Sequence, residues 1–99
     1  MNMQALMKQA QKMQADLMKE KEAINQKEFE GKSSSVSVRV NGKKEILEVK
    51  IDRSLELDKD DFEMLEDMIM IAINDAMKQV DEETESSMGK FGPGLSSMM

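Results

Sequence analysis

Apolar residues in the first quarter of the chain recur at heptad spacing. One column of the repeat holds Met3, Ala10, Leu17 and Ile24, and a second holds Leu6 and Met13. Because this segment contains no Gly or Pro and is rich in good helix formers, the pattern predicts a helix over residues 1–26. Lys8, Lys12 and Lys19 fall on the face away from the apolar seam. The seam is long enough to pair with another helix, but packing on a sheet of the same chain explains it equally well.

The pattern then changes from helical spacing to strict alternation. Val36, Val38 and Val40 are separated by single polar residues, and this alternation predicts a half-buried strand. A shorter run around Phe29, over residues 27–32, predicts an additional strand. We therefore expect a three-stranded antiparallel sheet over residues 27–53.

An Asn41-Gly42 pair follows the valine strand directly. Asn-Gly supplies the positive φ angles of a type I′ turn and is the strongest short-range signal for a hairpin. A two-residue loop would place Val40 opposite Lys43 and Val36 opposite Leu47. The valines would then share a face with the apolar residues of the next strand: Leu47, Val49 and Ile51.

The second half of the chain predicts another long helix, over residues 58–88. Asp58 or Asp60 can cap its start, and Asp60 with Glu63 has the spacing of a capping box. Residues 68–73 are apolar on every side of this helix, yet six residues cannot span a bilayer, so we expect protein rather than membrane to bury them. Residues 89–99 are rich in Gly, Ser and Met and are expected to form a flexible tail.

The two predicted helices are long compared with the domain that contains them. At 1.5 Å per residue they reach about 37 and 42 Å, whereas a compact chain of this length is about 33 Å across. We therefore predict one domain, residues 1–99, whose helix ends project or pack on a second copy. A homodimer would bury the apolar segment of the second helix, with these interface residues: Met68, Ile69, Ile71, Ala72 and Ile73.

Composition argues against catalysis. The chain contains no His and no Cys, so the usual general base, the thiolate nucleophile and the common zinc ligands are missing. The acidic run Asp58, Asp60, Asp61 has Phe62 where a calcium loop needs an oxygen ligand. We therefore predict a protein that is not an enzyme and that has no metal site, no cofactor and no small-molecule substrate.

Charge is distributed unevenly along the chain. The net charge is −6, but residues 1–53 sum to +3 and residues 54–99 to −9. Because charges are screened over about 8–10 Å in physiological salt, distant acids do not cancel a local basic stripe. The N-terminal segment is Gln-rich and helical in pattern where a secreted protein would have an apolar signal core, so we expect a cytoplasmic protein with no membrane association.

Several segments, in order along the chain, together resemble the YbaB/EbfC family of bacterial nucleoid-associated proteins. They are Leu6-Met7-Lys8-Gln9-Ala10-Gln11-Lys12-Met13-Gln14, Val38-Arg39-Val40-Asn41-Gly42, Val49-Lys50-Ile51-Asp52, Glu63-Met64-Leu65-Glu66-Asp67 and Asn74-Asp75-Ala76. The resemblance implies an α+β subunit of order α-β-β-β-α: a long N-terminal helix, a three-stranded antiparallel sheet and a long C-terminal helix. It also implies a tweezer-like homodimer that binds DNA in the nucleoid. Where the family usually has Pro after the third strand, this chain has Arg53.

The resemblance also suggests which residues contact double-stranded DNA. Lys8 and Lys12 match the first-helix motif of the family, and Lys19 extends their stripe. Lys43 and Lys44 at the hairpin tip are further candidates, with Arg39 a weaker one. We expect weak sequence preference because no base-reading aromatic residue or Arg pair is present. Two alternatives remain: an adaptor that grips a protein partner through Met-rich helices without nucleic acid, and an RNA-binding protein, for which stacking residues are scarce.

Overall fold

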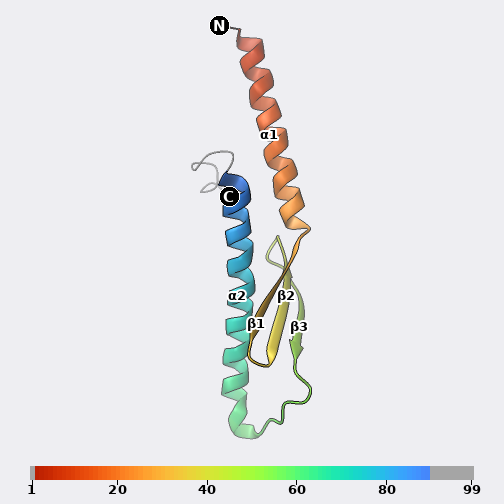
Figure 1. Cartoon of the computed structure of the whole chain (residues 1–99), viewed down its shortest axis with the longest axis vertical. Coiled ribbons are helices and arrows are strands. Elements are labelled where there is room, and N and C mark those ends of the chain that lie inside the picture. The colour runs from red at the N-terminus through yellow and green to blue at the C-terminus, as the bar shows by residue number, and fades with distance from the viewer. Residues whose placement is uncertain (1, 90–99) are drawn as a thin grey trace.

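The structure, a computed structural model, describes residues 2–89. The chain folds in the order α-β-β-β-α, and the three strands form one antiparallel sheet of order β1-β2-β3 with α2 on one face (Figure 1). The elements are α1 (Met3–Asn25), β1 (Glu28–Ser33), β2 (Val36–Asn41), β3 (Ile46–Ile51), the short 3-10 helix η1 (Lys59–Asp61) and α2 (Phe62–Met88). The predicted α+β class and element order are confirmed. The predicted C-terminal tail lies almost entirely outside the described residues.

Helix α1 stands out from the rest of the subunit. Asn2 caps it by accepting a hydrogen bond from the Gln4 N–H at 3.1 Å, and Ile24 is the one residue of α1 that is fully buried. The subunit measures 72 × 20 × 14 Å, and its radius of gyration is 19.4 Å, against about 13 Å for a compact chain of 100 residues. Figure 1 shows why: α1 continues away from the sheet, whereas α2 lies along it.

The core lies between the sheet and one stripe of α2. Every fourth residue of α2 from 68 to 80 faces the valines of β2, so that seven buried side chains form one cluster: Val36, Val38, Val40, Met68, Ala72, Ala76 and Val80. At Gly31 the backbone of β1 approaches α2 so closely that a Cβ would collide with the Ala72 carbonyl oxygen. Small residues at this crossing therefore set the distance between helix and sheet.

The two edges of the sheet differ. Along β1, α2 supplies partners for backbone groups that an edge strand leaves open: the Lys32 N–H donates to the Asp75 carboxylate at 3.1 Å, and Gln79 Nε2 donates to the Glu30 carbonyl at 2.8 Å. Helix α2 packs on β1 and β2 and leaves β3 uncovered. As a result Leu47 and Val49 of β3 are 45% and 44% exposed.

The predicted hairpin forms between β2 and β3, but its predicted register and turn are wrong. Val36 pairs with Ile51 and Val38 with Val49, so Leu47 is not opposite Val36, and a bulge beside Arg39 brings Ile46 opposite Val40. The turn is longer than two residues because the Asn41 side chain accepts hydrogen bonds from the N–H groups of Lys43 and Glu45. The positive φ is at Lys44, at +64°, and not at Asn41.

The start of α2 and the burial of its middle also differ from expectation. Asp58, one of the two predicted caps, is the N-cap of η1, but its capping box joins it to Asp61 and not Asp60 to Glu63: the Asp58 N–H donates to the Asp61 carboxylate at 2.9 Å. Residues 68–73 are not buried on every side within the subunit. Met70 and Ile71 are 55% and 52% exposed because α2 has only one face against the sheet.

The crossing at Gly31 generates a stability prediction. Gly31→Ala should lower the free energy of unfolding by about 1–3 kcal/mol, since the added methyl forces α2 away from the sheet. For a chain of this size each kcal/mol lowers Tm by about 4–8 °C, measurable by thermal denaturation. Gly89→Ala is the matched control, because a Cβ there meets nothing within 4 Å. Equal Tm values for the two variants would contradict this account of the core.

Candidate nucleic-acid interface

Three of the predicted DNA-binding lysines form a stripe on α1. Lys8, Lys12 and Lys19 are separated by one and two helical turns, so they share one face and extend over about 17 Å at 1.5 Å per residue. All three are exposed, and within residues 2–89 none has a carboxylate within 4.0 Å. The stripe is therefore available to an anionic partner along the whole arm.

The β2–β3 hairpin tip is docked against the base of α1. The Gly42 N–H donates to the Lys27 carbonyl at 3.1 Å, and a Cβ at residue 42 would collide with the carbonyl of Ile24. Glycine is needed here for this close approach. The contact brings Lys43 and Lys44, far from α1 in sequence, to the end of the helix that bears the lysine stripe.

A cleft of about 530 Å³ separates the base of α1 from the C-terminal part of α2. Lys44 pairs with Asp81 across it at 2.6 Å, and Lys27 pairs with Glu83 nearby. The lining residues are Lys21, Ile24, Asn25, Gly42, Lys43, Lys44, Val80, Asp81, Thr84, Glu85 and Met88. One wall is basic and the other acidic, so acidic residues of α2 partly neutralise the lysines at the base but not those farther out on α1.

The structure thus divides the predicted lysines into two groups. Lys43 and Lys44 lie at the base of α1, and Lys8, Lys12 and Lys19 lie on α1 itself. Lys8 and Lys12 are on the projecting half of the helix, which has no neighbour among the described elements (Figure 1). Sequence reasoning missed Lys21, which lines the cleft beside the hairpin tip. Lys21 lies one turn before the buried Ile24, which places it near the base of α1. Its nearness to the hairpin tip, however, could not be predicted, because it depends on docking of the hairpin against α1.

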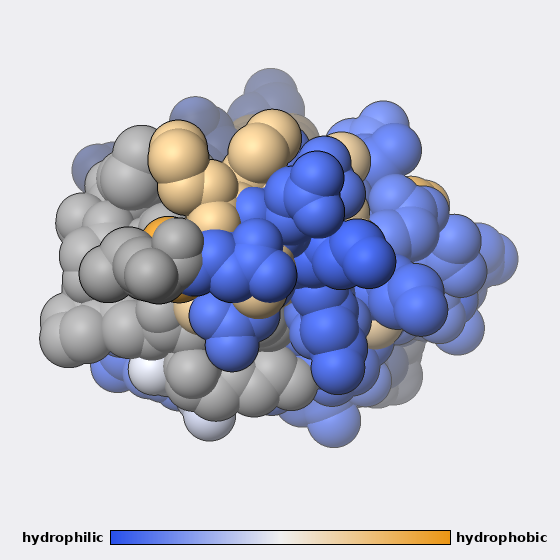
Figure 2. Space-filling view, turned by 90° about the horizontal axis from the view of Figure 1, so that it is seen from above, coloured by the Kyte–Doolittle hydropathy of each residue, from blue (hydrophilic) through white to orange (hydrophobic). Residues whose placement is uncertain are grey.

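The N-terminal part of the apolar seam of α1 is uncovered. Seen from above, the described surface is largely hydrophilic, with a group of apolar side chains on one side (Figure 2). The exposed apolar residues of α1 are Met3, Leu6, Met7, Met13 and Met18. Three of these belong to the heptad seam, whereas Leu17 is half-buried and Ile24 is buried, so the chain packs only the C-terminal end of the seam.

The residues expected at a dimer interface are in different surroundings. Met68 and Ala72 are buried in the subunit's own core, while Ile69 and Ile73 are partly buried against it. Ile71 is exposed and lies about 200° around the helix from Ile69, at about 100° per residue. These five residues therefore do not form one continuous surface.

Two other kinds of site are absent from the described part of the chain. Within residues 2–89 no three His, Cys, Asp or Glu side chains are grouped so that they could hold a metal ion. None of the helices in that range is both long and apolar enough to cross a membrane.

The model of the YbaB/EbfC DNA-binding family matches residues 1–95. The chain belongs to this family. A nucleoid-associated protein of Lactobacillus acidophilus is 43% identical over 96% of this chain and 86% of its own length. One from Clostridium novyi is 46% identical over 96% of this chain and 84% of its own.

A solved structure shows the same fold. The crystal structure of an uncharacterised protein of Helicobacter pylori matches with a TM-score of 0.70 and 28% identity, covering 87% of this chain and 91% of that one. The predicted family is therefore confirmed, and its members are described as DNA-binding and nucleoid-associated. These findings do not favour the alternative of an adaptor that binds no nucleic acid.

Proposed function

We propose that this protein binds double-stranded DNA as a homodimer, through the phosphate backbone and with low sequence specificity, and so organises the nucleoid or regulates genes in the cytoplasm. The observation on which the proposal rests is the unpaired stripe of Lys8, Lys12 and Lys19 on a helix that projects from its own subunit. Membership of a DNA-binding family supports it. No catalytic role is proposed.

The chemistry of the arm supports binding to phosphates over reading of bases. Lysine ammonium groups act as point charges toward phosphate, whereas base readout relies mainly on bidentate Arg, Asn or Gln contacts in the major groove. The two arginines are both outside α1, and Arg39 is held by Glu28 at 3.0 Å and Glu48 at 3.9 Å. Arg39, the weaker of the predicted DNA contacts, is therefore engaged by carboxylates of the sheet.

The homodimer is supported by the uncovered side of the sheet at β3. Val49 lies opposite Val38, so its side chain is on the face that α2 covers elsewhere, yet α2 does not reach it. Leu47 and Val49 of β3, with Ile69 and Ile73 on the flank of α2, offer apolar surface that a second copy would bury. A two-fold axis would use the same patch on both subunits, and would place two α1 arms on one assembly.

The DNA proposal predicts a change in salt dependence. In Lys8→Gln/Lys12→Gln, the slope of log affinity against log salt should fall in magnitude by about 2 per bound protomer, because each lysine lost removes one phosphate contact. Fluorescence anisotropy with several unrelated duplexes measures the slope, and the loss should be the same for every sequence.

The matched control for this experiment is Lys59→Gln/Lys78→Gln, which removes the same charge from exposed positions on η1 and α2. It should leave both affinity and slope unchanged. If the control weakens binding as much as the arm variant, net charge and not the α1 stripe drives binding. Absence of binding by the wild-type protein even at low salt would reject the function.

The dimer proposal predicts a monomer when charge is placed on the β3 patch. Val49→Glu should dissociate the dimer in sedimentation velocity, because a carboxylate would be buried without a partner. Lys50→Glu alters the adjacent residue on the opposite face of the same strand and should remain dimeric. Circular dichroism checks that both variants fold. A dimeric Val49→Glu protein would place the interface elsewhere.

A further inference from the structure

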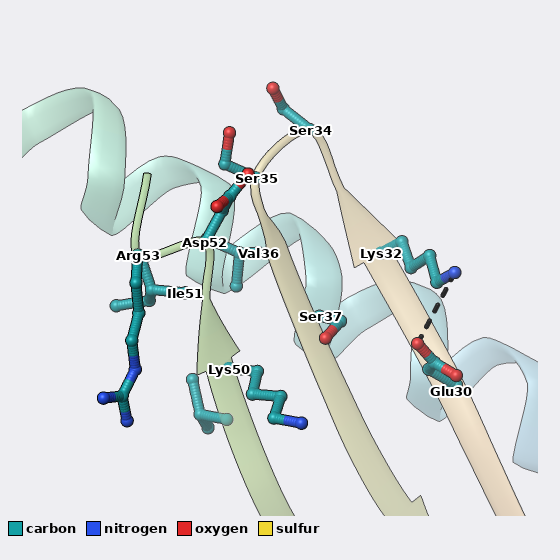
Figure 3. A pocket seen from close by; sticks show the side chains of 11 residues that line it. Glu30, Lys32, Ser34, Ser35, Val36, Ser37, Lys50, Ile51, Asp52 and Arg53 are labelled. Atoms are coloured by element: carbon teal, nitrogen blue, oxygen red, sulfur yellow. Dashed lines mark ion pairs between the residues drawn. The ribbon is translucent and has the colours of Figure 1, made fainter. Parts of the chain in front are cut away.

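A basic hollow lies on the sheet face opposite α2. It has a volume of about 520 Å³ and is formed by the β1–β2 turn, β2 and the end of β3. Cross-strand pairing sets Lys32 beside Ser37 and Ser37 beside Lys50, so these three residues form one row across the sheet. In Figure 3 this row faces the viewer, Lys50 reaches toward β2, and α2 passes behind the sheet.

Cations in this hollow are weakly neutralised. Lys32 has only a loose contact with Glu30, at 3.6 Å between two exposed side chains. Within residues 2–89, Lys50 and Arg53 have no carboxylate within 4.0 Å. Three cations therefore face two carboxylates, those of Glu30 and Asp52, so the hollow has a local excess of positive charge in a protein that is acidic overall.

The second of these carboxylates is already engaged by its own turn. Asp52 Oδ1 accepts hydrogen bonds from the Ser54 N–H at 2.9 Å and the Ser54 hydroxyl at 2.8 Å. These bonds, with the backbone bond the largest cause, hold the pKa of Asp52 below its usual value. Both bonds tie this carboxylate to the turn that follows β3.

Serine hydroxyls complete the lining. Ser34, Ser35 and Ser37 all border the hollow, and across the described residues none of their hydroxyls donates to or accepts from another protein group. Ser34 and Ser35 are in the β1–β2 turn, and this turn is held in place because the Asp52 N–H donates to the Ser35 carbonyl at 2.8 Å. Ser34 adopts φ of +50°, a conformation that favours Gly or Asn, so a serine here costs backbone energy.

We propose that this hollow binds phosphodiester groups of a second DNA duplex, so that one assembly holds two duplexes. The proposal rests on the proposed function for its first duplex. Ammonium, guanidinium and hydroxyl donors are the groups that bind backbone phosphates. No aromatic side chain lines the hollow, so a nucleobase would find no stacking surface there.

The two basic sites lie at different ends of the sheet. The hollow is at the end of the sheet away from α1, as Figure 1 shows for the β1–β2 turn. Strands of six residues separate it from the base of α1 by about 20 Å at 3.4 Å per residue, which exceeds the screening length of about 8–10 Å. Phosphates bound along α1 and phosphates bound at the hollow are therefore largely screened from one another, so the two sites can be occupied independently.

A capture experiment tests the proposal. One duplex is fixed to beads, the full-length protein is bound to it, and retention of a second, fluorescent duplex is measured. Lys50→Gln/Arg53→Gln should reduce capture of the second duplex about fivefold or more, through the loss of two phosphate contacts. Affinity for a single duplex should stay within about twofold because the α1 stripe is intact. The control is Lys59→Gln/Lys78→Gln.

Any of three results would reject the proposal that the hollow binds a second duplex. These are unchanged capture by the Lys50/Arg53 variant, equal loss in the control, or no capture by the wild-type protein. Sedimentation of the variant must give the wild-type mass, since a changed mass would mean that these residues form a subunit interface, which also overturns the proposal.

Amide chemical shifts separate this proposal from the proposed function. On titration with a short duplex, the ¹⁵N amide signals of Ser37 and Lys50 should move, as should those around Lys8 and Lys12. Movement on α1 alone leaves the function standing and rejects the hollow. Movement at Ser37 and Lys50 alone rejects the α1 contacts and the second duplex together, because the hollow would then be the first DNA site. If inorganic phosphate but not the duplex shifts Ser37 and Lys50, the site takes small anions and the proposal fails.

Discussion

The close approach of α2 to β1 at Gly31 determines how the rest of the subunit is arranged. Because residues 72 and 76 are alanines, the helix backbone reaches the sheet, and Asp75 and Gln79 come within hydrogen-bond distance of the β1 edge. The same placement leaves β3 without a covering helix. One crossing thus closes one edge of the sheet and leaves apolar surface at the other, which is where we place the second subunit.

A consequence of this arrangement is that α1 has no part in the core beyond its last turn. Ile24 is buried, the hairpin tip fastens the base of the helix, and the Ser87 hydroxyl donates to Glu20, whereas residues 2–16 are exposed. Such an arm exposes lysines without requiring a basic protein. Acids of α2, such as Asp81 and Glu83, lie against the base of the arm, so the net charge of −6 describes the whole chain but not the surface that α1 presents.

The β2–β3 hairpin shows which features a local sequence pattern can predict and which it cannot. The Asn41-Gly42 pair correctly indicated a turn between two strands, since alternation of apolar residues on both sides specifies pairing. It did not specify the register, because the Asn41 side chain stabilised a longer loop and a bulge changed the count of residues. Gly42 is required by contact with the end of α1, which no local rule contains. Lys43 and Lys44 therefore lie beside α1 only because the hairpin tip docks against the base of that helix.

Periodicity, breaker residues and composition were enough to determine the element order, both long helices and the stripe of Lys8, Lys12 and Lys19, because these depend on neighbours within a few residues along the chain. Tertiary structure alone decided which apolar side chains of residues 68–73 were buried, since that depends on which side of α2 meets the sheet. It also assembled the row of Lys32, Ser37 and Lys50 from three strands. Residues so far apart in sequence become neighbours only through strand pairing.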